Sequence, residues 1–368
     1  IDARTQEELA EHANAWNELL KETENAPPLV SYPWISAFFQ HKVIPGERWL
    51  CIFIYENDKL SGVFPLIAGY SGRFLFCSIL LLKLPYNVLH TRGIDFLVRQ
   101  GREEIIDVLI SYFRHKPGVY PLFSYKYIPE NSVSLNYFER RENRFCTIKR
   151  PVGAVNVINM DDGFEKYYSG LSNSFRRNLR RCERKIETIP NSRFLIDDIS
   201  RLPEDNLERF IEVEHRNWKG RNCSSLKNEA SDVMLFRDAA SKLTEAGLVR
   251  WDFLESENKT IAGQFSIRTK DKIHILKIGY DEDFAAFSPG NVLLSKTIEH
   301  CGCHVDFMSD SAWNDNWNPQ PCPIFHLIAL PRIPALSGIC KILIKNGISR
   351  LFNGSGNQRR KHQPLHKN

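Results

Sequence analysis

The chain has 368 residues and a mass of 42.7 kDa, and its hydrophobic residues (42%) and charged residues (25%) occur in the proportions of a folded globular protein. This composition excludes a disordered chain, a collagen-like chain and a bundle of membrane-spanning helices. At this length two domains are expected, because one hydrophobic core rarely serves more than about 250–300 residues. No apolar stretch approaches the roughly 20 residues that a spanning helix needs.

The net charge of +5 is concentrated at the C-terminal end. Residues 332–368 hold eight Lys and Arg and no Asp or Glu, which leaves 41 basic against 44 acidic residues in 1–331, a net charge of −3. The charge of the body therefore gives no reason to expect nucleic-acid binding. Nine cysteines without a repeated spacing and the lack of a signal-peptide pattern predict reduced thiols and a cytoplasmic protein.

Two segments that lie about two hundred residues apart have a similar pattern. Residues 49–67 and 251–267 each read as a strand that opens with Trp, a polar turn that contains Asn, and a second strand with Gly near its start. The similarity indicates either an internal duplication or two hairpins that are alike by chance. In the first half, amphipathic helices are predicted before the hairpin at 6–21 and at 31–41, the latter opened by Pro33.

The second half follows the same order of helices before strands. Helices are predicted at 163–189, interrupted near Gly170, and at 206–218 and 231–246; after the hairpin come a strand at 272–280, a helix at 291–301 and a strand at 303–309. This order predicts an α+β (mixed α/β) fold with mostly antiparallel sheets and flanking helices. The expected domains are 1–150 and 151–331, followed by a basic amphipathic tail, 332–368.

The strand at 272–280 changes phase in its middle. Ile273 and Ile275 share one face, whereas Leu276, Ile278 and Tyr280 share the other. Because side chains alternate along a strand, this change indicates either a β-bulge or a strand buried on both faces. A bulge would open a slot beside the next strand.

The loop that follows leads into a helix whose start can bind an anion. Ser288, Pro289 and Gly290 allow close approach to the backbone, and Asn291 is a candidate N-cap. The first turn of a helix has free N–H groups and a partial positive charge that bind phosphate. The alternative is a capped helix without a ligand.

An ordered set of motifs resembles a known family. The set comprises SNSFRRNLRR at 172–181, WKG at 218–220, GYDE at 279–282 with SPG at 288–290, and DF at 306–307 ahead of WNDNW at 313–317. It resembles the CelD-like (cellulose-biosynthesis type) acetyltransferases of the GNAT superfamily, which are related to the Fem peptidyltransferases with their twin GNAT domains. The first half resembles that family more loosely, through 31–34, 62–66 and 90–95.

The resemblance implies two tandem GNAT-like domains, of which the second binds acetyl-CoA or another acyl-CoA. In such domains two splayed strands hold the pantetheine arm and the next helix start holds the pyrophosphate. The residues implied to bind the cofactor are Lys277, Ile278, Gly279, Ser288, Pro289, Gly290, Asn291, Val292 and Leu293. The chain departs from the usual GNAT pattern, because Ser-Pro-Gly replaces the Gln/Arg-x-x-Gly-x-Gly/Ala motif, and Trp313-Asn314 stands where the family commonly has Tyr-Lys.

Direct acylation of an amine needs a base and a group that stabilises the developing charge. Three candidates are Asp306, which faces away from its apolar neighbours on the strand, Tyr280 at the end of the first splayed strand, and Glu214 on a helix bordering the acceptor side. Their structural alternatives are a turn or cap acid, a core residue and a surface residue respectively.

Four further residues are candidates for substrate binding. Arg176 and Arg180 belong to a run of cations with i, i+4 spacing, which suits either a phosphate or anionic sugar–lipid ligand or a solvated helix face. Lys219 and Trp313 are expected to contact the acceptor. No metal is expected, because His300-Cys-Gly-Cys-His304 lacks the second ligand pair that a zinc site needs.

The function that these predictions favour is transfer of an acyl group, expected to be acetyl, from acyl-CoA to an amine or hydroxyl of a sugar or cell-envelope (polysaccharide) precursor. One alternative is an aminoacyl-tRNA-dependent, Fem-like peptidyltransferase; another is a non-catalytic GNAT-fold binding module. The tail has an apolar stripe flanked by cations, which predicts either peripheral contact with the anionic inner face of the membrane or a helix docked on the body.

Overall fold

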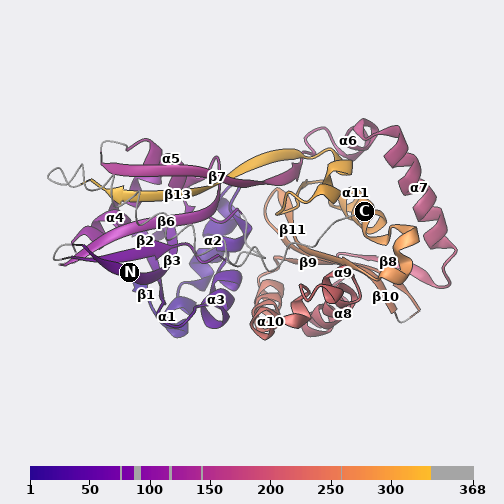
Figure 1. Cartoon of the computed structure of the whole chain (residues 1–368), viewed down its shortest axis with the longest axis horizontal. Coiled ribbons are helices and arrows are strands. Elements are labelled where there is room, and N and C mark those ends of the chain that lie inside the picture. Colours follow the sequence, from indigo (N-terminus) through magenta and orange to yellow (C-terminus); the bar gives the residue numbers. More distant parts are fainter. Residues whose placement is uncertain (75–76, 87–92, 116–117, 142–143, 258, 333–368) are drawn as a thin grey trace.

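The computed structural model describes residues 1–368 except 75–76, 87–92, 116–117, 142–143, 258 and 333–368. The chain forms two halves, each with helices packed on part of one continuous sheet (Figure 1). The strand order is β1-β2-β3-β4-β6-β13-β7-β12-β11-β10-β9-β8, and β5 pairs with β3. The predicted mixed α/β fold with a mostly antiparallel sheet is therefore confirmed.

Each half runs from helices to strands in chain order. The elements of the first half are β1 Asp2–Ala3, α1 Gln6–Ala10, α2 Ala13–Glu22, η1 Pro28–Val30, α3 Tyr32–His41, β2 Arg48–Glu56, β3 Lys59–Phe74, β4 Cys77–Lys83, β5 Leu97–Val98, η2 Glu103–Ile105, α4 Ile106–Arg114, β6 Val119–Pro129, α5 Val133–Glu139 and β7 Phe145–Ile158. Those of the second are α6 Phe164–Gly170, α7 Asn173–Glu187, β8 Ser192–Ile196, α8 Pro203–His215, α9 Trp218–Arg221, η3 Leu226–Asn228, α10 Ala230–Glu245, β9 Val249–Ser256, β10 Lys259–Arg268, β11 Lys272–Tyr280, η4 Glu282–Phe287, α11 Pro289–Cys301, β12 His304–Asp306, η5 Ala312–Trp317 and β13 Gln320–Pro331.

The two similar hairpins occupy equivalent places in the sheet. In β2–β3 and in β9–β10 the pairing slips by one residue just after the turn, which leaves Ser61 and Ile261 as the extra residues. In each half the hairpin is followed by an antiparallel third strand and then by a parallel fourth, β4 and β6 in the first and β11 and β12 in the second. This equivalence is the topology that an internal duplication predicts.

The two halves share a long two-stranded ribbon. Strand β7 runs without a break through 146–151, where the sequence pattern is interrupted and a domain boundary is expected. Strand β13 pairs with β7 along its whole length, and its residues Ile324–Ala329 also pair with β6 of the first half. Both strands extend from one half to the other in Figure 1. The last described strand of the chain therefore completes the sheet of the first half.

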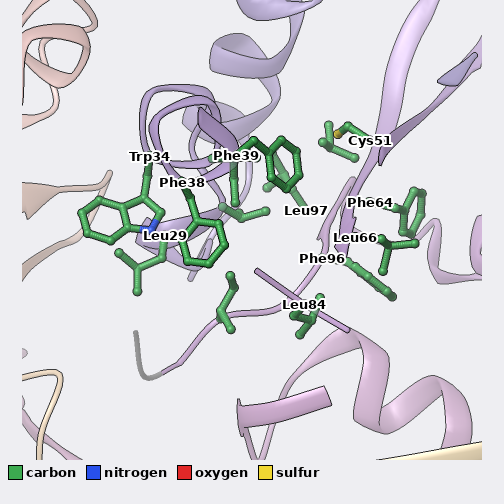
Figure 2. Packing of buried hydrophobic residues seen from close by; sticks show 14 of the residues in the cluster. Leu29, Trp34, Phe38, Phe39, Cys51, Phe64, Leu66, Leu84, Phe96 and Leu97 are labelled. Atoms are coloured by element: carbon green, nitrogen blue, oxygen red, sulfur yellow. The ribbon is translucent and has the colours of Figure 1, made fainter. Parts of the chain in front are cut away.

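Aromatic side chains fill the core of the first half. Strand β3 contributes Phe64, which packs edge-to-face on Phe96 at 4.8 Å between ring centroids, while α3 contributes Trp34 and Phe38 (Figure 2). Trp34 also packs edge-to-face on Phe236 of α10, at 5.6 Å. The helix α3 begins with Pro33 in its first turn, as predicted. This helix therefore joins the two halves through their cores.

The observed elements follow the predicted ones with three corrections. The helix predicted at 6–21 is broken around His12 into α1 and α2. The last predicted strand is shorter, because β12 ends at Asp306 and Met308 takes a left-handed φ of 51° that turns the chain. Helix α11 begins two residues earlier than predicted, so Ser288 and not Asn291 is its N-cap.

Residues 333–368 of the C-terminal tail and the turn residue Asn258 lie outside the described residues, as does half of the loosely similar segment 90–95. The predicted membrane contact of the tail therefore stays a prediction. Among the helices of the described residues, none combines the length and the hydropathy that crossing a membrane requires.

Candidate functional site

Strands β11 and β12 separate after a short stretch of pairing. They pair in parallel only from Lys272–His274 to His304–Asp306. Immediately beyond, Phe265 of β10 faces Lys277 while Ser266 faces Ile275, so Leu276 is the extra residue of a β-bulge. The phase change in the sequence is therefore a bulge, and the two strands diverge from it, because a bulge bends its strand and increases its twist.

A pocket of about 890 Å³ lies at this divergence. It is lined by the α9 region (Asn217, Trp218, Lys219 and Ser224), β11 (Ile275, Leu276, Lys277, Ile278 and Tyr280), the end of η4 and start of α11 (Ala285, Ser288, Pro289, Gly290 and Asn291) and the segment after β12 (Phe307, Met308, Ser309, Ser311, Ala312 and Trp313). Its size is that of a site for a substantial small molecule. Nine residues predicted from the sequence line it: Lys219, Lys277, Ile278, Tyr280, Ser288, Pro289, Gly290, Asn291 and Trp313.

The start of α11 offers an unpaired N–H group to this pocket. Ser288 has a left-handed φ of 47° and its hydroxyl makes no capping hydrogen bond. The N–H groups of Asn291 and Val292 donate to the Ser288 carbonyl, whereas the Gly290 N–H has no partner among the described residues. The first turn of α11 contains no acidic residue. This end of the pocket is therefore suited to an anion.

Three of the residues predicted to bind the cofactor, Gly279, Val292 and Leu293, do not line the pocket. Val292 and Leu293 are buried in the core, so only their backbone faces the helix start. Gly279 does not line the pocket; a Cβ there would lie 2.8 Å from the Cα of Glu214. Gly279 therefore allows α8 to pack directly on β11. The side chain of Asn291 accepts a hydrogen bond from Trp317 Nε1 at 3.2 Å, which ties α11 to η5.

Glu214 is fully buried beside the pocket and does not line it. Lys219 Nζ donates to its Oε1 at 3.0 Å and the Leu226 N–H donates to its Oε2 at 2.8 Å, while Lys277 Nζ lies 3.7 Å from Oε1. Burial favours a higher pKa for Glu214, but the attraction of Lys219 and Lys277 outweighs it and lowers the pKa. The alternative of a surface residue is therefore wrong, because Glu214 is a buried counter-ion for two lysines.

Lys277 is the most unusual ionisable group of the pocket. Its side chain is only 9% exposed, and its Nζ lies 3.7 Å from Glu214 Oε1 and 5.9 Å from the ring centroid of Phe236. Burial lowers the pKa of Lys277 to about 8, although the charge of Glu214 opposes that shift. Lys219, in contrast, also donates to the carbonyl of Ile278 at 2.8 Å.

Asp306 lies at the point where the strands separate. Its Oδ2 is 3.3 Å from His274 Nδ1, and its Oδ1 accepts from the Met308 N–H at 2.7 Å. Asp306 does not line the pocket. Its carboxylate instead accepts from the backbone of the left-handed turn at Met308. This is the structural role, a turn acid, that the sequence offered as the alternative to catalysis.

The remaining candidates fall in two places. Tyr280 packs beside Gly290 at the helix start, and Trp313, 37% exposed, packs edge-to-face on Phe307 at 5.4 Å between centroids. Arg176 and Arg180 lie on α7 and do not line the pocket. Among the residues that the structure describes, no three His, Cys, Asp or Glu side chains are arranged to hold a metal ion.

Sequence reasoning missed the contribution of α9. Asn217, Trp218 and Ser224 line the pocket together with Lys219, yet only Lys219 was expected there. Sequence reasoning also gave Lys277 no role beyond that of one cofactor-binding residue among nine. Its special position was indicated by a lysine that directly follows a phase change in an otherwise apolar strand.

Comparisons with known proteins agree with this geometry. Residues 173–308 match the family described as the acetyltransferase (GNAT) domain. No curated protein sequence matches the chain. The family match is to GNAT domains in general, so the finer CelD-like assignment stays a prediction.

Three solved structures have a similar fold, each at 11% sequence identity. FemX has a TM-score of 0.61, covering 92% of this chain and 99% of its own. A conserved protein of unknown function from Bacteroides thetaiotaomicron has a TM-score of 0.56, with 88% and 97% covered. The C-terminal domain of a putative lysylphosphatidylglycerol synthetase from Agrobacterium fabrum has a TM-score of 0.51, with 91% and 96% covered. Residues 173–308 thus match a GNAT acetyltransferase domain, within an overall fold that is similar to that of FemX.

Proposed function

We propose that the chain transfers an acyl group, expected to be acetyl, from acyl-CoA to an amine or hydroxyl of a sugar or cell-envelope precursor. One observation carries the donor part of this proposal: the slot between β11 and β12 leads to the unpaired Gly290 N–H at the start of α11. An extended pantetheine arm fits beside a strand whose partner has moved away, and a pyrophosphate suits the helix start.

The acceptor part rests on the other end of the pocket. Lys219, Trp218 and Trp313 line it around α9 and η5, which gives a cation and two aromatic faces. Aromatic faces stack on sugar rings and lysine binds anionic groups, so an anionic sugar derivative is the acceptor that we propose. In this arrangement Tyr280 donates a proton to the departing thiolate, and Asp306 acts through the turn that it holds.

Thermal unfolding with CoA and a series of acyl-CoAs tests the donor. A ligand at about one hundred times its Kd stabilises the folded chain by about 2.7 kcal/mol. We expect CoA and acetyl-CoA to raise the unfolding temperature by several degrees and dephospho-CoA or pantetheine to raise it less. No shift with any of these compounds would refute the donor.

A second candidate is an aminoacyl-tRNA-dependent peptidyltransferase. It is favoured by α7, on which six cations have no carboxylate partner among the described residues: Arg176, Arg177, Arg180, Arg181, Arg184 and Lys185. Filter binding with bulk tRNA tests it against the first candidate. Salt-sensitive tRNA binding that is lost when Arg176 and Arg180 become Glu, without any CoA-induced stabilisation, would favour the tRNA-dependent reaction.

A further inference from the structure

The pocket contains an amine that is only loosely paired, with Glu214 at 3.7 Å and the Phe236 ring centroid at 5.9 Å from its Nζ. This amine belongs to Lys277, which is nine-tenths buried and lines the pocket. The nearest carboxylate oxygen, Glu214 Oε1, lies 3.7 Å away and already accepts from Lys219. An ammonium group has three N–H donors, and Glu214 at 3.7 Å leaves room for this amine to contact a bound molecule.

The position of Lys277 along the slot is the second observation. The slot has the bulge at Leu276 at one end and the start of α11 at the other, where Gly290 faces Tyr280 and Ile278. If the pyrophosphate binds at Gly290, the pantetheine arm leads away from α11 and toward the bulge. Lys277 directly follows the bulge, so its amine lies where the arm brings the thioester.

The surroundings of Lys277 make the amine a competent nucleophile. The groups that act on its charge are Glu214 of α8, Lys219 of α9 and Asp232 of α10. Burial is the largest influence, and with a pKa of about 8 roughly one tenth of the amine is neutral at pH 7. Desolvation next to another cation is a known way to activate a lysine for attack on a carbonyl.

We propose that Lys277 is a self-acylation site: when acyl-CoA is bound and no acceptor is present, its ε-amine takes the acyl group. This inference rests on the proposed function. The neutral Nζ attacks the thioester carbonyl, the C–N bond forms and the C–S bond breaks. CoA leaves as the thiolate, and the proton lost from Nζ passes to that thiolate. The product is an amide in the slot, which blocks the next donor and limits the reaction to one turnover per chain.

The experiment incubates the full chain with acetyl-CoA alone and measures the acetylated residue by peptide mass spectrometry. We expect one acetyl group per chain, on Lys277, and none on the intact mass of Lys277→Arg. The rate rises about tenfold from pH 6 to pH 7 and levels above about pH 8, because it follows the neutral amine. Lys296 of α11 is the control lysine, because Glu183 raises its pKa despite its partial burial, so it reacts slowly at pH 8.

Two variants separate this proposal from the donor proposal. Glu214→Gln removes the carboxylate that raises the pKa of Lys277, so its acetylation at pH 7 becomes faster than in the wild type. Gly290→Asp removes acetylation by acetyl-CoA but leaves acetylation of Lys277 by acetic anhydride unchanged. If acetyl-CoA stabilises the wild type and yet Lys277 is modified no faster than Lys296, the self-acylation proposal is overturned while the donor proposal stands. If acetyl-CoA neither stabilises nor modifies the chain, both proposals fail.

Discussion

The two halves of the chain share a strand topology, but in the described residues their equivalent parallel strands pair to different extents. In the first half β4 and β6 pair in parallel over six residues, Ser78–Lys83 with Val119–Ser124. In the second half the equivalent strands β11 and β12 pair over only three residues and then diverge at the bulge. The pocket of the second half lies where this pairing stops.

The helices that cross between these strands differ as well. Helix α4 of the first half carries Asp107 in its first turn, and 3₁₀ helix η2 before it carries Glu103 and Glu104. Helix α11 of the second half has no acidic residue there. Carboxylates at a helix start occupy the site that an anion would use and repel a phosphate. The two halves therefore differ in two features at once: the second has shorter pairing between its parallel strands and a helix start without carboxylates.

The largest expected effect is the loss of donor binding in Gly290→Asp. A carboxylate at this position repels the pyrophosphate and crowds the free N–H, so we expect CoA affinity to fall at least a hundredfold, about 2.7 kcal/mol. Gly290→Ala is the matched control, because its Cβ would lie 3.5 Å from Tyr280 Cδ1 and 3.8 Å from Ile278 Cδ1, which are ordinary contacts. Isothermal titration calorimetry measures both. Equal affinities of the two variants would place the pyrophosphate elsewhere.

The next effect concerns the close contact of α8 with β11. In Gly279→Ala the new Cβ meets the Glu214 backbone at 2.8 Å, so we expect a loss of about 2.5 kcal/mol in the free energy of unfolding. Gly69→Ala in the first half is the control, because its nearest neighbour is Glu47 Cγ at 3.7 Å. Urea denaturation compares the two. Similar unfolding free energies would show that α8 moves away at little cost.

A smaller effect tests a buried polar group of the first half. His326 accepts or donates a hydrogen bond with Ser124 Oγ at 2.9 Å, and burial, with Lys126 and Arg150, lowers its pKa to about 3. The unfolded chain then binds a proton that the folded chain does not, so stability falls as the pH drops below about 6.5 toward 3. Between pH 7 and pH 5 this amounts to about 2 kcal/mol.

His326→Gln keeps a hydrogen-bonding side chain and cannot gain a proton. We expect the difference in unfolding free energy between wild type and variant to change by about 2 kcal/mol from pH 7 to pH 5, measured by urea denaturation. CoA affinity at constant pH should not change, because His326 does not line the pocket beside β11. A pH-independent difference would show that the folded chain accommodates the charged imidazole.

The smallest effect is that of Asp107→Asn. Asp107 accepts from the Tyr137 hydroxyl at 2.7 Å and from Arg141 and Arg144 at 3.0 and 3.1 Å. Because the carboxylate is partly exposed, we expect a loss of about 1 kcal/mol in unfolding free energy. Calorimetry should still find one CoA per chain, since β4 and β6 remain paired. A second CoA would mean that the helix start alone defines the site.

Much of the site was predictable because its signals are local. The phase change at Leu276 predicted either a bulge or a strand buried on both faces, and the structure has the bulge; Ser-Pro-Gly predicted a helix start beside the slot. The position of Glu214 was not predictable, because an amphipathic helix does not reveal what it packs against. Only the contact with Gly279, sixty-five residues further on, brings Glu214 between the two lysines.

The pairing of β13 with β6 of the first half could not be predicted from the sequence either. Its twelve residues include Pro321, Pro323 and Pro331, which weaken the strand pattern. Its partners in β6 are about two hundred residues away, and no local pattern specifies such a pairing. The predicted division near residue 150 used only the local interruption at 149–153 and therefore placed β13 with the second half alone.

The position of β13 also sets an order of events during synthesis. When β6 leaves the ribosome, the strand that covers it on that side is still about two hundred residues from being made. At roughly 5–20 residues per second, this edge waits on the order of 10–40 s. An open edge strand of this kind pairs readily with other chains. The sheet of the first half therefore keeps an unpaired edge along β6 until β13 has been translated, which comes after the rest of the second half.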